Sequence, residues 1–263
     1  MSGSAWFESL HWGGPWMAPF ASHAAPVMQA LRQGQTVAQM LNALADGQQA
    51  SGGGVVPVRF VSQAFLPEGQ AYEDFIFRHH QVPTRDNLHD LFNGLAWLRF
   101  PRTKARLNAL QAQAIVSVGV GATRGPLRDA LTLFDENAAL LLGPPDLLEA
   151  LRSRQWRRLF IELRPLWAQA QVMLFGHAAQ EKLQQPRKAI TAHVYLPRHP
   201  LPAEGLDAAL AEDLEAAHLA EKPYSPLPIL GIPGWWPDNQ DDSFYDDPCV
   251  FRPVPQVRAP MAP

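Results

Sequence analysis

The chain has 263 residues, of which 47% are hydrophobic and 18% are charged, and its formal net charge is −3. This composition is typical of a globular protein and excludes the low hydrophobicity and high charge of intrinsic disorder. Since single cores of this size are common, we predict one domain over residues 1–263, with an aromatic N-terminal arm (1–25) and an irregular C-terminal segment (222–263).

The chain has one cysteine, Cys249, so an internal disulfide is excluded and a reducing compartment is favoured. A secretory signal begins with a basic segment, whereas the first twenty residues of this chain contain no Lys or Arg. No apolar stretch approaches the roughly 20 residues that a membrane helix needs. These features predict a soluble cytoplasmic protein that does not enter a membrane.

The N-terminal part combines aromatic residues with turn-forming ones. Three Trp and two Phe lie among Gly and Pro in residues 6–20, which predicts an ordered arm without a long helix. The apolar period of residues 26–44 is broken at Gly34 and predicts two short helices. Residues 46–54, rich in Gly, Gln and Ser, predict a surface loop, and the alternation in residues 55–61 predicts a strand.

The region from Ala71 onward carries the clearest helical pattern. A first helix must end before Pro83, because proline disfavours a helical conformation in the residue that precedes it. Asn87 is a good N-cap for a second helix, with Asp90 as a capping-box partner. Pro101 breaks or restarts this helix, which then continues to Ile115.

The remaining chain alternates helical and strand patterns. The pattern first predicts a loop at Gly119 and Gly121, a helix that ends in a left-handed Asn137, and a buried strand over 138–142. A helix capped by Asp146, with Glu149 at its third position, follows. The last predicted elements are a helix over 165–183, a strand over 191–196 and an acidic helix over 205–219. No repeat of 20 to 50 residues is visible. The pattern therefore predicts an α+β fold, predominantly α-helical with a few short strands.

Charge is distributed unevenly along the chain. Residues 78–164 contain 13 Lys and Arg against 8 Asp and Glu, whereas residues 204–251 contain one Lys against 11 acids. In one interpretation the acidic part packs across the basic middle and the two fields cancel. In the other, a basic face stays open for an anionic ligand.

Polar side chains gather at the start of the second helix. His89 and Asn93 are four residues apart and share a helix face, while Arg85, Asp86 and Asp90 lie in the first turn. A histidine titrates near neutrality, and a neighbouring carboxylate can fix its tautomer for acid–base chemistry or metal ligation. Alternatively, these residues cap the helix and His89 hydrogen-bonds to a loop.

A second polar group lies between residues 128 and 137. Asp129, Thr132 and Glu136 share one helix face, and Arg128 and Asp135 lie together on another. Paired carboxylates can act as acid and base or bind a divalent ion. They can equally form a solvated face and an ion pair.

The C-terminal segment places aromatic residues beside acids in residues 234–247, with Tyr245 as a candidate ligand-binding residue. An EF-hand loop starting at Asp238 would lack its central glycine and would have Cys249 at position twelve, so it is not expected. The aromatic residues either line a polar pocket or clamp the segment to the helices.

Other motifs are absent or incomplete. His79, His80, His177 and His193 form a metal site with His89 only if tertiary folding brings them together, because no His-Glu-x-x-His spacing exists, so no metal is assigned. The P-loop, Gly-x-Gly-x-x-Gly and Gly-x-Ser-x-Gly motifs are also absent. Arginines surround Trp156, but the net charge argues against a nucleic-acid partner.

Several segments of the sequence resemble a bacterial family known only as domain of unknown function 3025. They are residues 72–77, 82–93 with Trp97 and 100–101, 129–137, 175–178, 231–235 and 244–247. The chain departs from the expected pattern at Ala138, where a glycine would follow Asp-Glu-Asn. The resemblance implies one domain and supports the choice of sites, but it implies no reaction.

The leading hypothesis is a small-molecule enzyme or ligand-binding protein. His89 would act as a base or ligand oriented by Asp86 and Asp90, and Asp135 and Glu136 would supply a second acidic group. The candidate ligand-binding residues are Arg85, Asp86, Asn93, Arg128, His177 and Tyr245. The alternative is a non-catalytic protein that binds a protein or RNA partner through its aromatic arm, its C-terminal tryptophans or its arginine-rich helix. The sequence identifies no cofactor and no oligomeric state.

Overall fold

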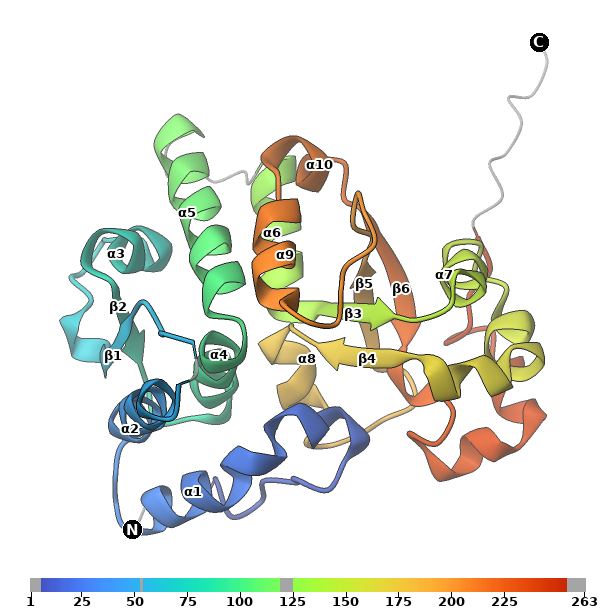
Figure 1. Ribbon diagram of the computed structural model, residues 1–263, viewed down its shortest axis with the longest axis horizontal. Coiled ribbons are helices and arrows are strands. Elements are labelled where there is room, and N and C mark those ends of the chain that lie inside the picture. The colour runs from blue at the N-terminus through green and yellow to red at the C-terminus, as the bar shows by residue number, and fades with distance from the viewer. Residues whose placement is uncertain (1–5, 53, 119–124, 255–263) are drawn as a thin grey trace.

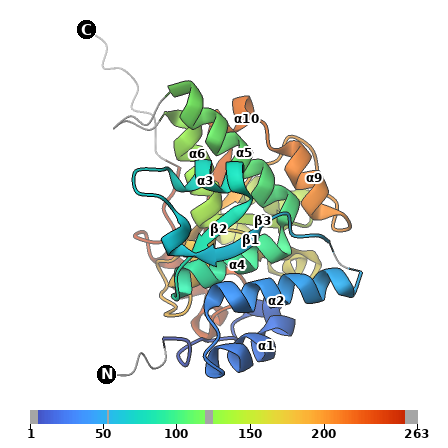
Figure 2. The same cartoon turned by 90° about the vertical axis from the view of Figure 1, so that its left-hand side faces the viewer.

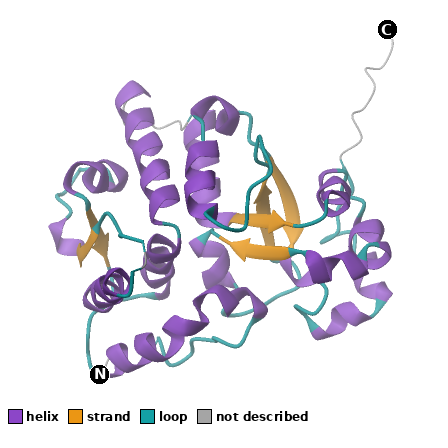
Figure 3. Cartoon of the chain, in the orientation of Figure 1, coloured by secondary structure: helices purple, strands orange, loops and turns teal. Residues whose placement is uncertain are grey.

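The computed structural model describes residues 6–52, 54–118 and 125–254 (Figure 1). Helices dominate these residues, and the strands gather in two separate small sheets (Figure 3). The predicted α+β fold with a helical majority is therefore confirmed. The predicted loop at Gly119 and Gly121 lies outside the described residues.

The helices and strands follow one another in irregular order. The helices are α1 (Ala21–Arg32), α2 (Val37–Ala50), α3 (Tyr72–His79), α4 (Leu88–Arg99), α5 (Pro101–Val118), α6 (Pro126–Asn137), α7 (Pro145–Arg152), α8 (His177–Lys182), α9 (Leu206–Asp213) and α10 (Ala216–Ala220). The strands are β1 (Arg59–Ser62), β2 (Gln81–Thr84), β3 (Ala138–Leu142), β4 (Gln171–Leu174), β5 (Thr191–Tyr195) and β6 (Tyr224–Pro228).

The first sheet is a parallel pair, β1 and β2, joined by the crossover helix α3 (Figure 2). Helix α2 packs on β1, and α3 packs on β2 and on α5. Thr36 is the N-cap of α2: its hydroxyl accepts from the Gln39 amide, and the Gln39 side chain accepts from the Thr36 amide, which forms a capping box.

The second sheet has the strand order β4-β3-β5-β6 and separates two apolar clusters. Because successive side chains of a strand face opposite sides, Ala139 and Leu141 of β3 join one cluster with α7 and the N-terminal arm. Ala138 and Leu140 join the other cluster with α6 and α9. Both clusters share this sheet, and the single domain over residues 1–263 stays a prediction.

Two strands contain proline and were not predicted. Strand β2 includes Pro83 and has one neighbour, and β6 includes Pro226 and Pro228 at the edge of its sheet. A proline lacks the amide that a central strand needs, so it fits at an edge. The strand predicted over 55–61 is observed as β1, which begins four residues later and ends one residue later.

The predicted helix over 165–183 is wrong. A short 3-10 turn, strand β4 and helix α8 occupy this region, because pairing of β4 with β3 overrides the helical apolar spacing. The acidic helix over 205–219 is two helices, α9 and α10, which are separated at Leu214. The predicted loop over 46–54 begins only after Ala50, where α2 ends.

Three predicted caps also differ. Asp146 lies inside the first turn of α7 and accepts a hydrogen bond from Arg158, while Pro144 occupies the N-cap position. Asn137 ends α6 without the left-handed conformation, and Ala138 continues directly into β3. Asp90 does not complete a capping box, because its carboxylate is bound by Arg85 instead.

Helix α4 begins as predicted at Asn87, whose side-chain oxygen accepts from the Asp90 amide at 2.8 Å. Replacing Asn87 with alanine is expected to lower the free energy of unfolding by about 1 kcal/mol, the usual value of such a cap. Urea denaturation measures the difference, and the matched variant Asn87→Asp should retain most of the stability. Equal losses in both variants would show that the cap contributes little.

The basic and acidic parts of the chain meet in the folded protein. Arg164 donates to the Asn239 carbonyl and to the Tyr245 hydroxyl, and Arg157 pairs with Asp246. The amides of Arg102 and Thr103, at the start of α5, donate to Asp207 of α9. These contacts agree with the interpretation that the two charged regions pack together. Among the described residues, no helix combines the length and apolarity needed to span a bilayer.

Candidate functional site

A cavity of about 380 Å³ lies where the starts of α3, α4, α5 and α8 meet the end of α6. Its polar lining residues are Gln63, Tyr72, Glu73, Arg85, His89, Asp90, Asn93, Lys104, Asn108, Gln111, Thr132, Asp135, Glu136 and His177. Several helix ends converge here, so polar and charged side chains share one cavity.

The sheet brings Glu136 and His177 together. Strand β3 follows α6 directly, and α8 follows β4 after two residues. In the antiparallel register Ala139 opposes Leu174, so Glu136 and His177 each lie three residues beyond a paired position. The amide of Gly176 donates to the Ala138 carbonyl at 2.9 Å and closes this junction. The end of α6 therefore lies against the start of α8.

His89 lies between a carboxylate and a second histidine. Its Nδ1 is 2.9 Å from Glu181 Oε2, and its Nε2 is 3.0 Å from His177 Nε2. An ionised carboxylate can only accept a hydrogen bond, so Nδ1 donates to Glu181. In the neutral ring this leaves the lone pair on Nε2, directed at His177. Glu181 thus fixes both the tautomer and the orientation of His89.

His177 is 3% exposed, and its surroundings keep it uncharged at neutral pH. Burial is the main cause and lowers the pKa of His177 to about 4, although the Asp135 carboxylate opposes the shift. Glu136 Oε2 lies 3.5 Å from His177 Nε2. Burial and the nearby Asp135 raise the pKa of the Glu136 carboxyl above its usual range.

Beneath the histidines, Lys104 forms a buried ion pair. Its ammonium donates to Asp135 Oδ1 at 2.5 Å and to Asn93 Oδ1 at 2.8 Å, and it lies 5.5 Å from the centre of the Trp97 ring. Burial alone would raise the pKa of Asp135, but Lys104 and His177 hold it below the usual value. Asn93 in turn donates to the Tyr72 hydroxyl at 3.1 Å.

Arg85 and Asp90 form the other charged pair at the cavity wall. The guanidinium of Arg85 donates through Nε and Nη2 to the two carboxylate oxygens, at 3.1 and 2.9 Å. The backbone amide of Arg85 also donates to Asp90, at 2.6 Å. Asp90 is 6% exposed, so this fork neutralises a buried charge and fixes the chain before α4.

Seven of the ten predicted site residues line this one cavity: Arg85, His89, Asp90, Asn93, Asp135, Glu136 and His177. Asp86, Arg128 and Tyr245 do not. Asp86 accepts from the Val37 amide at the start of α2, and Tyr245 hydrogen-bonds to the Gly231 carbonyl in the C-terminal segment. The catalytic and binding roles of the seven remain predictions.

The predicted partners of His89 and Asp135 need correction. Asp86 and Asp90 do not orient His89, because each is engaged with another group, and Glu181 takes that place. Asp135 pairs with Lys104 of α5 rather than with Arg128 of its own helix. In both cases a contact across two helices replaces the local one expected from spacing.

Three residues that contact the predicted site residues, Glu181, Tyr72 and Lys104, were not selected as site residues from the sequence. Glu181 follows His177 by one helical turn, and that spacing was a usable signal. Tyr72 opens α3 within one of the segments that resemble the family, but nothing in its neighbourhood indicates a polar contact. Lys104 follows Pro101 in the first turn of α5. It is only 4% exposed, and nothing in the sequence indicates this burial.

These observations define a helical α+β protein with a histidine and carboxylate cavity at its centre. The chain belongs to the family described as a protein of unknown function, DUF3025, whose model matches residues 58–255. The match includes every polar residue named above as lining the cavity. No curated protein matches the chain. No solved structure matches it either.

Proposed function

We propose that this protein is an enzyme that acts on a small polar molecule in the cavity around His89. The proposal rests on the chain of contacts from Glu181 through His89 to His177, at a cavity of about 380 Å³. This volume falls within the range of small-molecule sites. Polar groups on buried helix faces are unfavourable unless they are partnered, and they are enriched at functional sites.

The proposed roles follow from the contacts. His89 presents the lone pair of Nε2 as a base or ligand, oriented by Glu181 in the way a carboxylate orients a catalytic imidazole. Glu136 supplies an acidic group beside it. The Lys104–Asp135 pair and Asn93 hold the floor of the cavity in place and offer hydrogen bonds to a polar ligand.

Replacing His89 with alanine is expected to abolish ligand retention while leaving the melting temperature nearly unchanged, because its side chain is about one-third exposed. The purified protein is equilibrated with an extract of cellular small molecules, and the retained compounds are identified by mass spectrometry. A retained compound is then incubated with the protein and its conversion followed over time.

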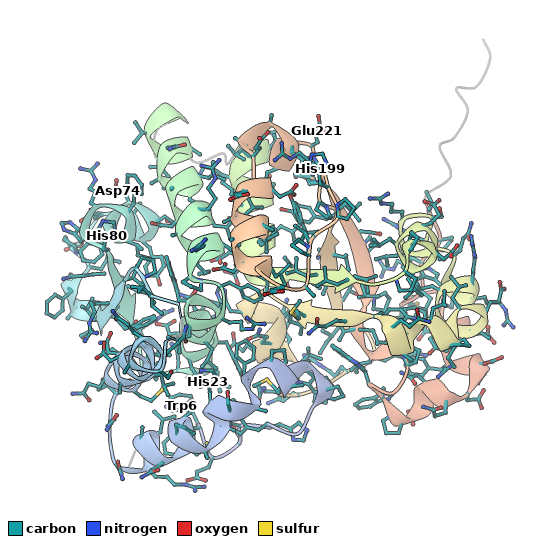
Figure 4. All side chains as sticks on the ribbon, in the orientation of Figure 1. Trp6, His23, Asp74, His80, His199 and Glu221 are labelled. Carbon is teal, nitrogen blue, oxygen red and sulfur yellow. The ribbon has the colours of Figure 1, made fainter. Side chains whose placement is uncertain are left out.

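His199→Ala is the matched control, because His199 is exposed and lies away from α4 and α8 (Figure 4). It should retain and convert the same compound as the unchanged protein. If the unchanged protein retains nothing beyond what His89→Ala retains, the proposal is wrong. A large loss of melting temperature in His89→Ala would instead indicate a structural role for this histidine.

The alternative, a non-catalytic interaction protein, has less support. It requires exposed aromatic or basic patches and no pocket around His89, whereas His89 lines a cavity. Trp16 and Trp156 are buried, and Trp235 and Trp236 pack against the core. Arg164 and Arg158 are engaged with the chain itself. A small-molecule ligand is therefore the favoured partner, and no nucleic-acid partner is proposed.

A cytoplasmic location remains part of the proposal. Its support is the single cysteine, Cys249, which is free and exposed. Exposed free thiols persist in reducing compartments and are oxidised elsewhere.

A further inference from the structure

We propose that His89, His177 and Glu136 together bind one divalent first-row transition metal ion, such as Zn²⁺, at the end of the cavity. The sequence assigned no metal, because no local motif required one. The inference rests on the proposed function for the role of the ion, but its test needs no substrate. It is carried by geometry, by the surrounding hydrogen bonds and by the distribution of charge.

The three ligand atoms are close enough to share an ion. One ligand atom from each residue lies within 4.8 Å of the others, and the two Nε2 atoms are 3.0 Å apart. Two nitrogen ligands of a tetrahedral Zn²⁺ are roughly 3.3 Å apart, given bonds of about 2.0–2.1 Å. A shift of a few tenths of an ångström would therefore suffice to accommodate the ion.

The hydrogen bond to Glu181 is what a metal-binding histidine needs. A ligating imidazole usually donates its second nitrogen to a carboxylate or a carbonyl, which fixes the tautomer and raises its basicity. His89 donates its Nδ1–H to Glu181 and directs the Nε2 lone pair toward His177, and a ligand atom of Glu136 lies within 4.8 Å of both histidines. Two imidazole nitrogens facing each other at hydrogen-bond distance require a proton or a cation between them.

Two of the carboxylates that line the cavity are paired with a cation, and Glu136 is not. Asp90 is paired with Arg85, and Asp135 is paired with Lys104. Within the described residues, Glu136 forms no ion pair with a lysine or arginine, and its neighbour is the uncharged imidazole of His177, whose Nε2 lies 3.5 Å away. A bound divalent ion would complete the charge balance of Glu136.

The donor set selects the class of metal. Two imidazoles and one carboxylate suit Zn²⁺, Fe²⁺ and related ions, whereas Mg²⁺ and Ca²⁺ prefer all-oxygen ligands. Three protein ligands also leave coordination positions open toward the cavity, as catalytic metal sites do. A bound ion would supply Lewis-acid polarisation of a ligand oxygen.

The test uses the full chain, stripped with a chelator and then dialysed against Zn²⁺ or, separately, against Mg²⁺. Elemental analysis is expected to give one tightly held Zn²⁺ per chain and no retained Mg²⁺. Glu136→Gln and His177→Ala should each weaken Zn²⁺ binding by on the order of 100-fold or more. Glu181→Gln should weaken it by about 10-fold, because it disturbs only the orientation of His89.

Two controls separate this site from surface binding and from misfolding. His199→Ala removes an exposed histidine and should bind Zn²⁺ like the unchanged protein. Melting curves in metal-free buffer check that each variant folds. If His177→Ala does not fold, Glu136→Gln still tests the site, because it keeps the shape of the side chain. In the unchanged protein, Zn²⁺ should also shift the imidazole NMR signals of His89 and His177.

The metal inference is overturned if the unchanged protein holds no stoichiometric Zn²⁺, or if Glu136→Gln and a folded His177→Ala hold it equally well. This outcome is distinct from failure of the proposed enzyme. A protein that retains a small molecule through His89 but no Zn²⁺ would keep the proposed function and lose the metal. A protein that binds Zn²⁺ but retains no small molecule would keep the metal site and lose the proposed function.

Discussion

Replacement of Lys104 by methionine is expected to lower the free energy of unfolding by about 3 kcal/mol, because it leaves a carboxylate without its cation in a largely buried position. Lys104 is 4% exposed, and its ammonium contacts both Asp135 and Asn93. Methionine keeps most of the apolar stem but lacks the ammonium, which also lies over the Trp97 ring. The loss of stability would therefore reflect the missing charge rather than a change in side-chain volume. Urea denaturation measures this loss.

The double variant Lys104→Met with Asp135→Leu tests the explanation. Removing both charges leaves no uncompensated ion, so the double variant should recover most of the stability lost by Lys104→Met alone. The matched lysine control is Lys182→Met, since Lys182 is exposed and donates to Asn137 at the surface. Its effect should stay below about 0.5 kcal/mol. A double variant less stable than Lys104→Met would contradict the ion-pair account.

Replacement of Gly176 by alanine is expected to destabilise the protein by about 3 kcal/mol and to disrupt the site as well. A Cβ at this position would lie 2.4 Å from the backbone nitrogen of Asn137, and the backbone of Glu136 is equally close. Backbone atoms at a strand junction have little freedom to move away. The end of α6 must therefore shift from α8, which separates Glu136 from His177.

Gly47→Ala is the control for this substitution. Gly47 lies inside α2 with open space around its Cα, so alanine there should be neutral or stabilising by about 0.5–1 kcal/mol. Chemical denaturation gives the stability of both variants, and dialysis against Zn²⁺ reports the site. If Gly176→Ala retains both its stability and its Zn²⁺ binding, the close approach of α6 and α8 does not position the ligands.

Local sequence signals determined where many of the helices and strands of this protein begin and end. The cap at Asn87 placed the start of α4, Gly34 separated α1 from α2, and the apolar run after Asn137 gave β3. These features depend on neighbouring residues, so the sequence contains their cause. Polar residues on apolar helix faces also identified most of the cavity lining, because burying such groups without partners is unfavourable.

Local patterns failed where long-range pairing decided the structure. The apolar residues of 171–174 fit a helix or a strand, and pairing with β3 made them β4. The prolines of β6 are compatible with a strand only because the sheet places it at an edge. Such choices depend on partners about thirty or more residues away, which spacing along the chain does not reveal.

The sequence by itself determined which residue types are available for chemistry, namely two histidines, several carboxylates and an asparagine on helices that must pack. Only the tertiary structure decided their partners: Glu181 for His89, Lys104 for Asp135, and His177 beside Glu136. The physical reason is that the antiparallel register of β3 and β4 fixes α6 against α8, while packing of α4 on α8 brings His89 to them.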